Sequence, residues 1–550
     1  MELGLKKISL TELLPLRAKI LRPGKKPDEC IYDSDMLPES FHLGAYDGDK
    51  LISVISIYKE NFESLEGQGY RIRSMATDEE YRGKGTGSVL LNYAESEIRK
   101  LNCDYIWFNA RSVAVNFYLK NGYIIISDEF DIPGIGLHFV MTKRLIPPGK
   151  LYDIKHINIK DYTYNLPTEK IAYYPQEKRD ESKLLIYNYK KISEDKFLNL
   201  PEYISKDSLL VFNNTKVIPG RFLFNSCEQT VEILCIEPFE NKDYRSVLSH
   251  NSGVKWECMI GKLKYWKDEY IQKEIYSGDK KIILKAKKQF QNNKFIVEFF
   301  WEPEELTFSE ILDLAGTTPL PPYIKRNSEE KDNETYQTVY ARNEGSIAAP
   351  TAGLHFTNEV LNSLQKKGVK NSFVTLHVNT GTFLPVKTET IGKHKMHSEY
   401  VQIQKQTLID LLNSEKIIAV GTTSMRAVES LYWLSYLILN KKNSKELNVT
   451  QWLPYENDFN ISKNFSLQIL IEYCDKNNLE VLNFKTALLI TPGFNFRYFK
   501  GIITNFHQPQ STLLLLIAAF LGDEYKNVYQ FALDNNFRFL SYGDSNLYLL

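Results

Sequence analysis

The chain has 550 residues, of which 43% are hydrophobic and 25% charged, and its formal net charge is +0. This length predicts two or three domains, and this composition is typical of a globular protein with an ample core. Zero net charge excludes a chain coated in basic residues, although it allows a local basic face for nucleic acid.

Cysteine spacing and apolar runs exclude further classes. The six cysteines are scattered without a CxxC pair, so a zinc knuckle, an iron–sulfur site and a disulfide framework are not expected. The N-terminal sequence lacks the pattern of a signal peptide. The longest apolar run, 513–521, has nine residues, far fewer than the ~20 that span a membrane. We therefore predict a buried helix there, in a cytoplasmic protein that does not associate with membranes.

In chain order, the first part predicts a mixed α/β unit. Strand patterns occur at 41–60, which predicts two strands, and at 70–77, 105–110 and 137–145. Between them, the sequence predicts helices at 87–102 and 113–122. The segment "RLIPPGKLYD" then has the Pro and Gly content of a linker. We predict a domain over 1–145, a linker over 146–152 and a second domain over 153–550.

A glycine-rich run, "MATDEEYRGKGTGSVLL", joins a strand to a helix in this first domain. Glycines let the backbone approach a ligand closely, and free N–H groups at a helix start bind anions, for which a diphosphate is the natural guest. The spacing fits neither a Walker loop nor a dinucleotide fingerprint, and an ordinary Gly-rich turn is the alternative. The candidate ligand-binding residues are Met75, Ala76, Arg82, Gly83, Lys84, Gly85, Thr86 and Gly87.

Residues 1–145 resemble the GCN5-related N-acetyltransferase (GNAT) family, whose RxxGxG loop matches Arg82, Gly85 and Gly87. The resemblance implies that this loop binds the pyrophosphate of acetyl-CoA, and that Tyr118 in "AVNFYLKNGY" protonates the leaving thiolate. A phenol suits this role because its pKa lies slightly above that of a thiol. The alternative for Tyr118 is a core aromatic; His138 is either a general base or a packed strand residue. The acceptor would be an amine of a small molecule or protein.

The second part predicts a larger α/β domain that contains an all-β insert. Between about 229 and 302 the sequence has short alternating runs such as "VEILCIEP", "KIILKAKK" and "KFIVEFFW", which predict a small β-barrel. Strand and helix patterns alternate again after the insert. The fold class is therefore multidomain, α/β and α+β.

Several segments of the larger domain place polar residues where a predicted strand ends. In "IIAVGTTSMRAVES" a strand ends at Val420 and a helix begins near Ser424, a corner that binds anions or nucleotides in open α/β sheets. Arg426 could pair with a carboxylate there, although an ordinary helix cap is the alternative. "TNFHQPQSTLLLL" likewise places His507 at a strand end, before a capped helix.

The segment "HKMHSE" contains His394, His397 and Glu399. HxxH without a partner of known geometry is a weak metal signal, and histidines also suit proton transfer near neutral pH. We expect no metal.

Nearly all of residues 152–548 resemble the S-adenosylmethionine:tRNA ribosyltransferase-isomerase family of the queuosine pathway. The matching blocks include "LLVFNNTKVIPGR", "PLPPYIKR", "AAPTAGLHFT", "TLHVNTGTF", "VGTTSMRAVES", "ITNFHQPQSTLL" and "RFLSYGDS". The resemblance implies transfer and isomerisation of the ribosyl group of S-adenosylmethionine onto 7-aminomethyl-7-deazaguanine in a tRNA anticodon. Epoxyqueuosine-tRNA, adenine and methionine are the products, so S-adenosylmethionine is consumed as a ribosyl donor.

Block membership under this resemblance assigns roles to individual residues. His355 and His377 are the expected base or acid, with His397 and His507 as alternatives. The residues expected to hold S-adenosylmethionine are Thr351, Gly353, Thr382, Thr423, Asn505 and, for its carboxylate, Arg426. Those expected to hold tRNA are Tyr323, Lys325 and Arg326, beside Tyr336 and Tyr340.

Two alternatives stay open. The N-terminal unit could be a non-catalytic binding module, and the chain could be a general S-adenosylmethionine-binding or methyl-transferring protein, which would release S-adenosylhomocysteine. We expect a monomer whose substrates are acetyl-CoA, S-adenosylmethionine and a tRNA with a modified guanine.

Overall fold

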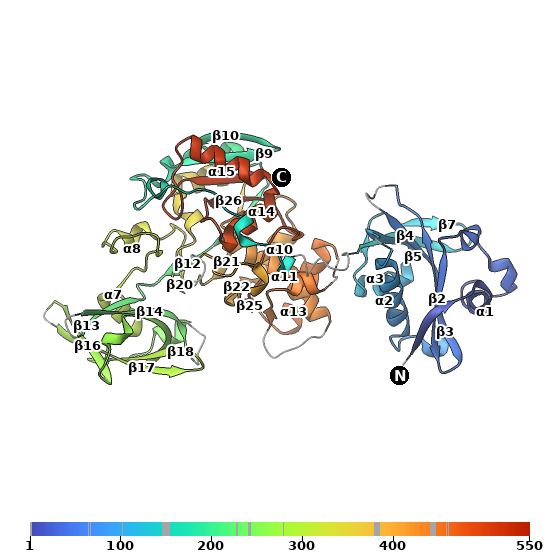
Figure 1. The fold of residues 1–550 in the computed structure, drawn as a ribbon, viewed down its shortest axis with the longest axis horizontal. Helices are drawn as coiled ribbons and strands as arrows, with labels where there is room; N and C mark the ends of the chain where they lie inside the picture. The colour runs from blue at the N-terminus through green and yellow to red at the C-terminus, as the bar shows by residue number, and fades with distance from the viewer. Residues whose placement is uncertain are drawn as a thin grey trace. The chain divides into compact units, whose positions relative to one another are not determined.

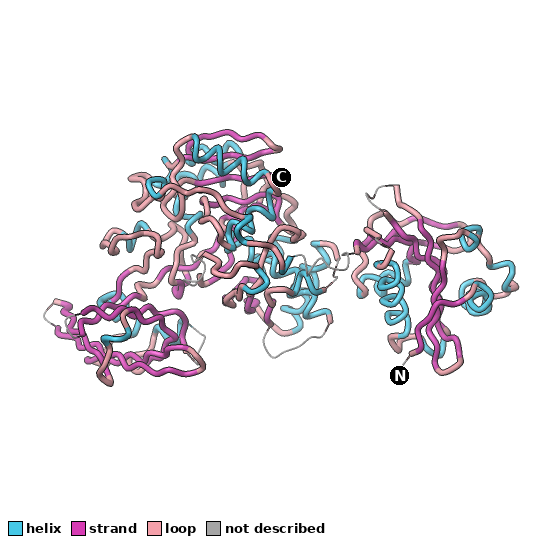
Figure 2. The backbone as a smooth tube through the Cα atoms, viewed as in Figure 1, coloured by secondary structure: helices cyan, strands magenta, loops and turns pink. Residues whose placement is uncertain are grey.

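A computed structural model describes residues 3–550 apart from 64, 66–67, 102, 146–153, 227–228, 240–243, 279, 379–384, 441–446, 458 and 460. The chain divides into two compact units, residues 1–153 with 454–466 and residues 154–453 with 467–550 (Figures 1 and 2). The predicted linker, 146–152, lies outside the described residues, so the predicted domain boundaries stay a prediction. No described helix is long and apolar enough to cross a membrane.

The N-terminal unit is built on a mixed, eight-stranded sheet in the order β1-β2-β3-β4-β5-β8-β6, with β7 beside β8. Its strands are β1 (Gly4–Ile8), β2 (Phe41–Asp47), β3 (Lys50–Lys59), β4 (Gly69–Thr77), β5 (Tyr105–Arg111), β6 (Ile124–Ile125), β7 (Phe130–Ile132) and β8 (Gly136–Arg144). Helices α2 (Thr86–Arg99) and α3 (Val115–Lys120) lie on one side of it and α1 (Leu10–Leu21) on the other (Figure 1). The predicted mixed α/β unit is confirmed.

Strands β4 and β5 diverge in the middle of this sheet. They pair in parallel only from Gly69–Tyr105 to Arg71–Trp107. Beyond that point β4 has a register shift against β3, and Ser74 has a φ of 54°. A bulge with positive φ in a non-glycine residue costs free energy and concentrates at functional sites. The bulge and the divergence together open the sheet at this point.

The second unit contains a ten-stranded sheet in the order β10-β9-β27-β26-β23-β11-β21-β22-β25-β24. In chain order these strands are β9 (Lys183–Asn188), β10 (Lys191–Lys196), β11 (Leu209–Asn213), β21 (Lys370–Leu376), β22 (Glu399–Gln404), β23 (Ile417–Val420), β24 (Asn448–Val449), β25 (Val481–Thr486), β26 (Phe499–Asn505) and β27 (Ser545–Leu549). The helices of the unit outside its β insert include α5 (Leu200–Tyr203), α8 (Asp332–Thr335), α9 (Asn358–Lys366), α10 (Lys405–Leu412), α11 (Thr422–Leu439), α14 (Thr512–Leu521) and α15 (Glu524–Asp534), together with most of α13 (Lys463–Lys476), whose first residues belong to the other unit. A short parallel pair, β12 (Thr215–Val217) with β20 (Asn343–Ser346), stands apart from the sheet.

The four central strands of this sheet, β26, β23, β11 and β21, are parallel to one another. β11 and β23 are buried along their whole length, as expected for strands covered on both faces. Their carboxyl ends therefore meet at one edge, the usual ligand edge of an open α/β sheet.

The β insert is a seven-stranded antiparallel sheet in the order β16-β17-β18-β15-β14-β13-β19. Its elements are β13 (Arg221–Ser226), β14 (Gln229–Pro238), α6 (Tyr244–Leu248), β15 (Val254–Gly261), β16 (Tyr270–Ser277), β17 (Lys280–Gln291), β18 (Lys294–Glu302), α7 (Phe308–Ala315) and β19 (Gly316–Thr317). The predicted limits of 229 and 302 miss β13 and β19, which pair with each other from opposite ends of the insert. Closure into a barrel stays a prediction.

Candidate active sites

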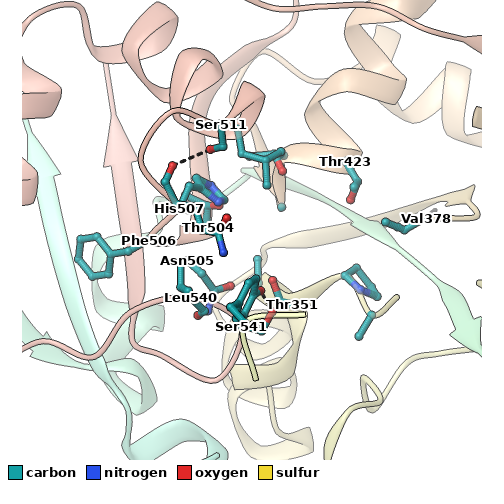
Figure 3. Close-up of a pocket in the computed structure, with 18 residues that line it drawn as sticks. Thr351, Val378, Thr423, Thr504, Asn505, Phe506, His507, Ser511, Leu540 and Ser541 are labelled. Atoms are coloured by element: carbon teal, nitrogen blue, oxygen red, sulfur yellow. Dashed lines mark hydrogen bonds between the residues drawn. The ribbon is translucent and has the colours of Figure 1, made fainter. Parts of the chain in front are cut away.

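A cavity of about 50 Å³ lies at the carboxyl edge of the four parallel strands. Strand β26 leads into it with Thr504, Asn505, Phe506 and His507, and Figure 3 shows these side chains with Thr423 and Val378 to their right. Its other lining residues are Tyr323, Ala349, Pro350, Thr351, Ala352, Gly421, Thr422, Gln508, Ser511, Leu513, Leu540 and Ser541.

Asn505 lines this cavity and has a side-chain oxygen without a hydrogen-bond partner among the described residues. Its Nδ2 donates hydrogen bonds to Leu540 O at 3.3 Å and to His355 Nε2 at 3.1 Å. Its Oδ1 is buried and has no hydrogen-bond partner. Because an unpaired buried carbonyl is costly, this oxygen is suited to accept a hydrogen bond from a ligand hydroxyl or amine.

His507 lines the same cavity. Its Nε2 lies 3.0 Å from Thr504 Oγ1, and its backbone N–H donates to Tyr529 Oη at 3.1 Å. No described residue hydrogen-bonds its Nδ1. Burial lowers the pKa of His507 to about 3, so the imidazole is neutral at pH 7 and has a nitrogen free for proton exchange.

The N-terminus of α11 forms another part of the wall. Gly421, the residue before the helix, has a φ of 89°, which favours glycine. The side chains of Thr422 and Thr423 line the cavity. The first-turn N–H groups of a helix lack intrahelical acceptors and attract anions, so this corner is suited to a carboxylate.

The segment "AAPTAGLHFT" lies across this edge of the sheet. Pro350 and Thr351 line the cavity, whereas His355 does not. His355 Nδ1 is 2.8 Å from Ser182 Oγ, and Nε2 accepts from Asn505. Burial lowers the pKa of His355 to about 3. With both nitrogens engaged, His355 holds Asn505 in place and has no nitrogen free for proton transfer in this arrangement.

His377 lies at the end of β21 and lines a second, smaller cavity. Its Nδ1 is 2.8 Å from Thr215 Oγ1, and its ring packs on Tyr244 at 4.4 Å between centroids. Burial lowers its pKa to about 4. Val378 lines both cavities, so the two cavities adjoin. His377 follows β21 and His507 follows β26, and β11 and β23 lie between these two strands in the sheet.

Two arginines predicted to bind substrate have their charge compensated within the protein. Arg426 is buried in an ion pair with Glu399. Arg326 forms a bidentate pair with Asp332 at 2.7 and 2.8 Å and lies over the Tyr174 ring at 4.2 Å. Neither guanidinium is available to a ligand without breaking these contacts.

The other tRNA-binding candidates differ in exposure. Lys325 is exposed, and Tyr323 lines the first cavity with its hydroxyl 2.5 Å from Ser541 Oγ. Tyr336 and Tyr340 are buried, which corrects the expectation that they offer aromatic surface for bases.

Three remaining predicted site residues lie away from the cavities or outside the description. His397 is exposed and lines neither cavity. A Cβ at Gly353 would overlap the Tyr340 hydroxyl, so this glycine serves packing. Thr382 lies outside the described residues. Among the described residues no cluster of three His, Cys, Asp or Glu side chains could hold a metal.

In the N-terminal unit, a cavity of about 290 Å³ opens between β4 and β5, where their pairing has ended. Ser74, Met75, Tyr118 and His138 line it. The Tyr118 hydroxyl donates to Met75 Sδ at 3.9 Å, and burial raises its pKa to about 12. His138 is buried, with Nδ1 2.6 Å from Gly136 O. The phenol is therefore protonated at neutral pH and lines this cavity.

The glycine-rich loop immediately precedes α2. Gly83 and Gly85 have φ values of 72° and 84°, which residues with a Cβ adopt only at a cost. A Cβ at Gly87 would stand 3.3 Å from both Met75 Cε and the Phe117 ring. Residues 82–85 are exposed. These glycines shape an exposed turn in front of the first N–H groups of α2, a position suited to an anion such as a diphosphate.

Sequence reasoning missed several cavity residues, notably Thr504, Ser541 and Leu540. Thr504 lies one residue before the end of the buried strand β26, the same signal that pointed to His507. Ser541 and Leu540 carry no such signal, because a long-range loop brings them to the cavity.

Comparisons with known proteins agree with this architecture. A family described as "Queuosine biosynthesis protein" matches residues 159–548, and the "Acetyltransferase (GNAT) family" matches residues 10–123. An S-adenosylmethionine:tRNA ribosyltransferase-isomerase from Rickettsia bellii is 37% identical over 404 residues, 71% of this chain and 99% of the relative. One from Finegoldia magna is 36% identical over 399 residues, 71% of this chain and 97% of the relative.

Among solved structures, S-adenosylmethionine tRNA ribosyltransferase from Thermotoga maritima is 26% identical, covering 71% of this chain and all 100% of that one, with a TM-score of 0.34. The chain thus belongs to the S-adenosylmethionine:tRNA ribosyltransferase-isomerase family over most of its length and has a GNAT-family acetyltransferase domain at its N-terminus.

Proposed function

We propose that residues 159–548 transfer and isomerise the ribosyl group of S-adenosylmethionine onto the aminomethyl group of 7-aminomethyl-7-deazaguanine in tRNA. The observation that carries this proposal is the cavity where the neutral His507, several threonines and Asn505, whose side-chain oxygen is unpaired, meet at the ends of parallel strands. Family membership supports the same reaction.

The positively charged sulfur of S-adenosylmethionine acidifies the carbon next to it, so a modest base can remove a proton there. Later steps break the bond from the sugar to adenine, join the sugar to the substrate amine, and release methionine as its carbon–sulfur bond breaks. Adenine leaves with a proton that an acid must supply. His507 and His377 line the cavities and are neutral at pH 7, since burial lowers the pKa of each to about 3 and about 4. We assign the base role to these two. The imidazolium that forms when one of them takes the carbon proton is then the acid that supplies a proton to the departing adenine. His355 is a positioning residue.

The remaining groups of the substrate find matching partners in the first cavity. Asn505 Oδ1 accepts from a ribose hydroxyl, and Thr351 and Thr423 supply hydroxyl groups. The methionine carboxylate binds at the N-terminus of α11, because Arg426 is held by Glu399.

tRNA is expected to present its modified base to this cavity from the side of Tyr323 and Lys325. Lys325 is exposed, so it can hold a phosphate, and Tyr323 lies in the cavity wall.

The products of one incubation test the reaction. The full chain, S-adenosylmethionine and tRNA carrying the aminomethyl base should release equal amounts of adenine and methionine, separated by chromatography. tRNA with ordinary guanine at that position is the matched control and should release neither. Accumulation of S-adenosylhomocysteine would refute the proposal in favour of methyl transfer.

The N-terminal unit, we propose, transfers the acetyl group of acetyl-CoA to an amine. The amine nitrogen attacks the thioester carbon, the carbon–sulfur bond breaks, and the leaving thiolate takes the proton of Tyr118. The proton that the amine loses passes to His138 or to water. The glycine cradle before α2, together with the protonated Tyr118 in the cavity, supports this activity.

Tyr118→Phe separates an active enzyme from a binding module. We expect the variant to bind acetyl-CoA as the wild type does in calorimetry, while amine-dependent release of CoA slows by a factor of about 100 or more. Binding without any acetyl transfer in the wild type would favour the non-catalytic module.

A further inference from the structure

The cavity of the N-terminal unit is lined by an unusual excess of positive charge. Four arginines contribute to its wall, Arg22, Arg71, Arg73 and Arg111, and none of its lining residues is acidic. Acetyl transfer by itself does not require these charges, because the glycine cradle at 82–87 holds the diphosphate and none of its residues lines this cavity.

Among the described residues, a carboxylate partner is found for one of the four arginines. Arg71 donates to Glu60 at 2.7 Å and lies over Trp107 at 4.4 Å. Among the described residues, no carboxylate lies within ion-pair distance of Arg22, Arg73 or Arg111. Burial lowers the pKa of Arg71, and the nearby charge of Arg73 lowers it further. Guanidinium groups that line one cavity without carboxylate partners repel one another, so an anion bound among them is favoured.

Within the described part of the chain, Arg73 is held by a ring contact and no residue accepts a hydrogen bond from its guanidinium. Its guanidinium lies 4.6 Å over the Tyr32 ring, a contact that fixes the plane and leaves the N–H edge available. Arg73 precedes the Ser74 bulge on β4, and Arg111 ends β5. The two arginines therefore stand on the two diverging strands, in the same cavity as Tyr118.

Arg71 and Arg73 lie on the face of the sheet opposite α2, which associates them with the acceptor and not with the phosphates of acetyl-CoA. Tyr70 and Ile72 of β4 pack in the core beneath α2, so the alternating Arg71 and Arg73 face the opposite side, where α1 packs on Val54 and Ala76. The phosphate cradle precedes α2. A cavity of about 290 Å³ that also admits the acetyl group leaves room for a molecule of amino-acid size.

We propose that the acetyl acceptor is a small amine that bears a carboxylate, such as an amino acid, with the carboxylate bound by Arg73 and Arg111. This inference rests on the acetyl-transfer function proposed above. Polycationic amines are excluded, since the same arginines repel them.

Paired acceptors test the proposal with the full-length chain. Each of the common amino acids is compared with its own amide, which keeps the amine and removes the negative charge, and spermidine serves as the polycation. CoA release is followed at saturating acetyl-CoA. We expect at least one amino acid to be acetylated with a kcat/KM tenfold or more above that of its amide, and spermidine to be inactive.

Arginine variants locate the effect. Arg73→Gln and Arg111→Gln should each raise the KM for that amino acid tenfold or more. Each should also reduce the ratio of its kcat/KM to that of the amide, while the affinity for acetyl-CoA stays unchanged. Lys100→Gln, which removes an equal charge from the exposed end of α2, is the matched control and should leave all values unchanged.

Three results would overturn the inference: amides or spermidine accepted as well as the acids, arginine variants with unaltered KM, or acetyl-CoA binding with no carboxylate-bearing amine acetylated. Failure of acetyl-CoA to bind at all is a different result. It would refute the acetyl-transfer function itself, and the inference with it.

Discussion

His355 and His507 are both buried imidazoles, but only His507 lines the cavity. Burial lowers the pKa of each to about 3, so charge does not distinguish them. Their hydrogen bonds do, because His355 spends both nitrogens on Ser182 and Asn505, whereas His507 keeps Nδ1 free of described partners. The two residues should therefore fail in different ways when substituted.

For His507→Gln we expect single-turnover adenine release to fall about 100- to 10,000-fold, the range for loss of a general acid or base, with little change in thermal stability. His355→Gln should instead lower the free energy of unfolding by about 1–3 kcal/mol, because it breaks a buried hydrogen-bond network. Rapid-quench kinetics and thermal unfolding measure the two effects. Equal kinetic losses with unchanged stability would contradict the assignment.

Neighbouring Lys325 and Arg326 offer a second contrast at the residue scale. Lys325→Gln should weaken tRNA binding and reduce its salt dependence by about one released counterion, without destabilising the fold. Arg326→Gln leaves the buried Asp332 carboxylate unpaired and should cost about 3 kcal/mol of stability. Binding titrations at several salt concentrations, alongside melting curves, measure both. If Arg326→Gln reduced the salt dependence of tRNA binding more than Lys325→Gln did, the assignment would be reversed.

At the scale of elements, both sites occur where strands end or separate. Four parallel strands bring Asn213, His377, Val420 and Asn505 to one edge of the large sheet. In the N-terminal unit, β4 and β5 pair and then diverge, so backbone and side chains of both strands become available to a ligand. Loops that follow such strands carry function because a rigid sheet positions them.

Gly85 and Gly48 provide a matched pair for testing the element that holds acetyl-CoA. Both have positive φ, 84° and 58°, and neither would meet another atom through an added Cβ. Each change to Ala should therefore cost about 1–2 kcal/mol of backbone strain. Only Gly85→Ala disturbs the loop before α2, and we expect it alone to weaken acetyl-CoA binding about tenfold or more in calorimetry. If both variants lost similar affinity for acetyl-CoA, the cause would be lower stability of the protein and not the loop before α2.

Across the whole molecule, buried titratable groups oppose one another as pH falls. His355, His377 and His507 have pKa values lowered from 6.5 to about 3–4. Their unfolded forms bind protons first, so stability present above pH 6.5 is lost as pH decreases. Glu429 accepts hydrogen bonds from the Arg497 and Tyr498 N–H groups, and burial raises its pKa to about 7. Its contribution is present below pH 4.5 and lost as pH rises through 7.

As pH falls from 7 to 5, each histidine lowers the free energy of unfolding by on the order of 2 kcal/mol, whereas Glu429 raises it by about as much. Three histidines against one glutamate predict a falling melting temperature for the larger unit as pH drops from 7 to 5. Glu429→Gln removes the opposing group and should steepen this fall, whereas His355→Gln should flatten it. Calorimetric scans at pH 5, 6 and 7 measure the slopes. A shallower slope in Glu429→Gln would contradict the stated sign.

The sequence by itself determined the local elements and the family. Strand ends at Val420 and Asn505, the glycine-rich start of α2 and the buried helix α14 were all predictable, because apolar periodicity, capping residues and glycines act over a few neighbouring positions. The ordered sequence blocks pointed to the same family that the relatives share.

Only the tertiary structure decided which side chains face a ligand. Arg326 and Arg426 read as substrate-binding groups until Asp332 and Glu399 were seen to neutralise them, and His355 reads as catalytic until Ser182 is placed beside it. These partners lie from six to more than a hundred residues away in the chain. Whether a polar group is spent within the protein or left free, as at Asn505 and Arg73, is fixed by packing between distant segments, which local sequence patterns do not encode.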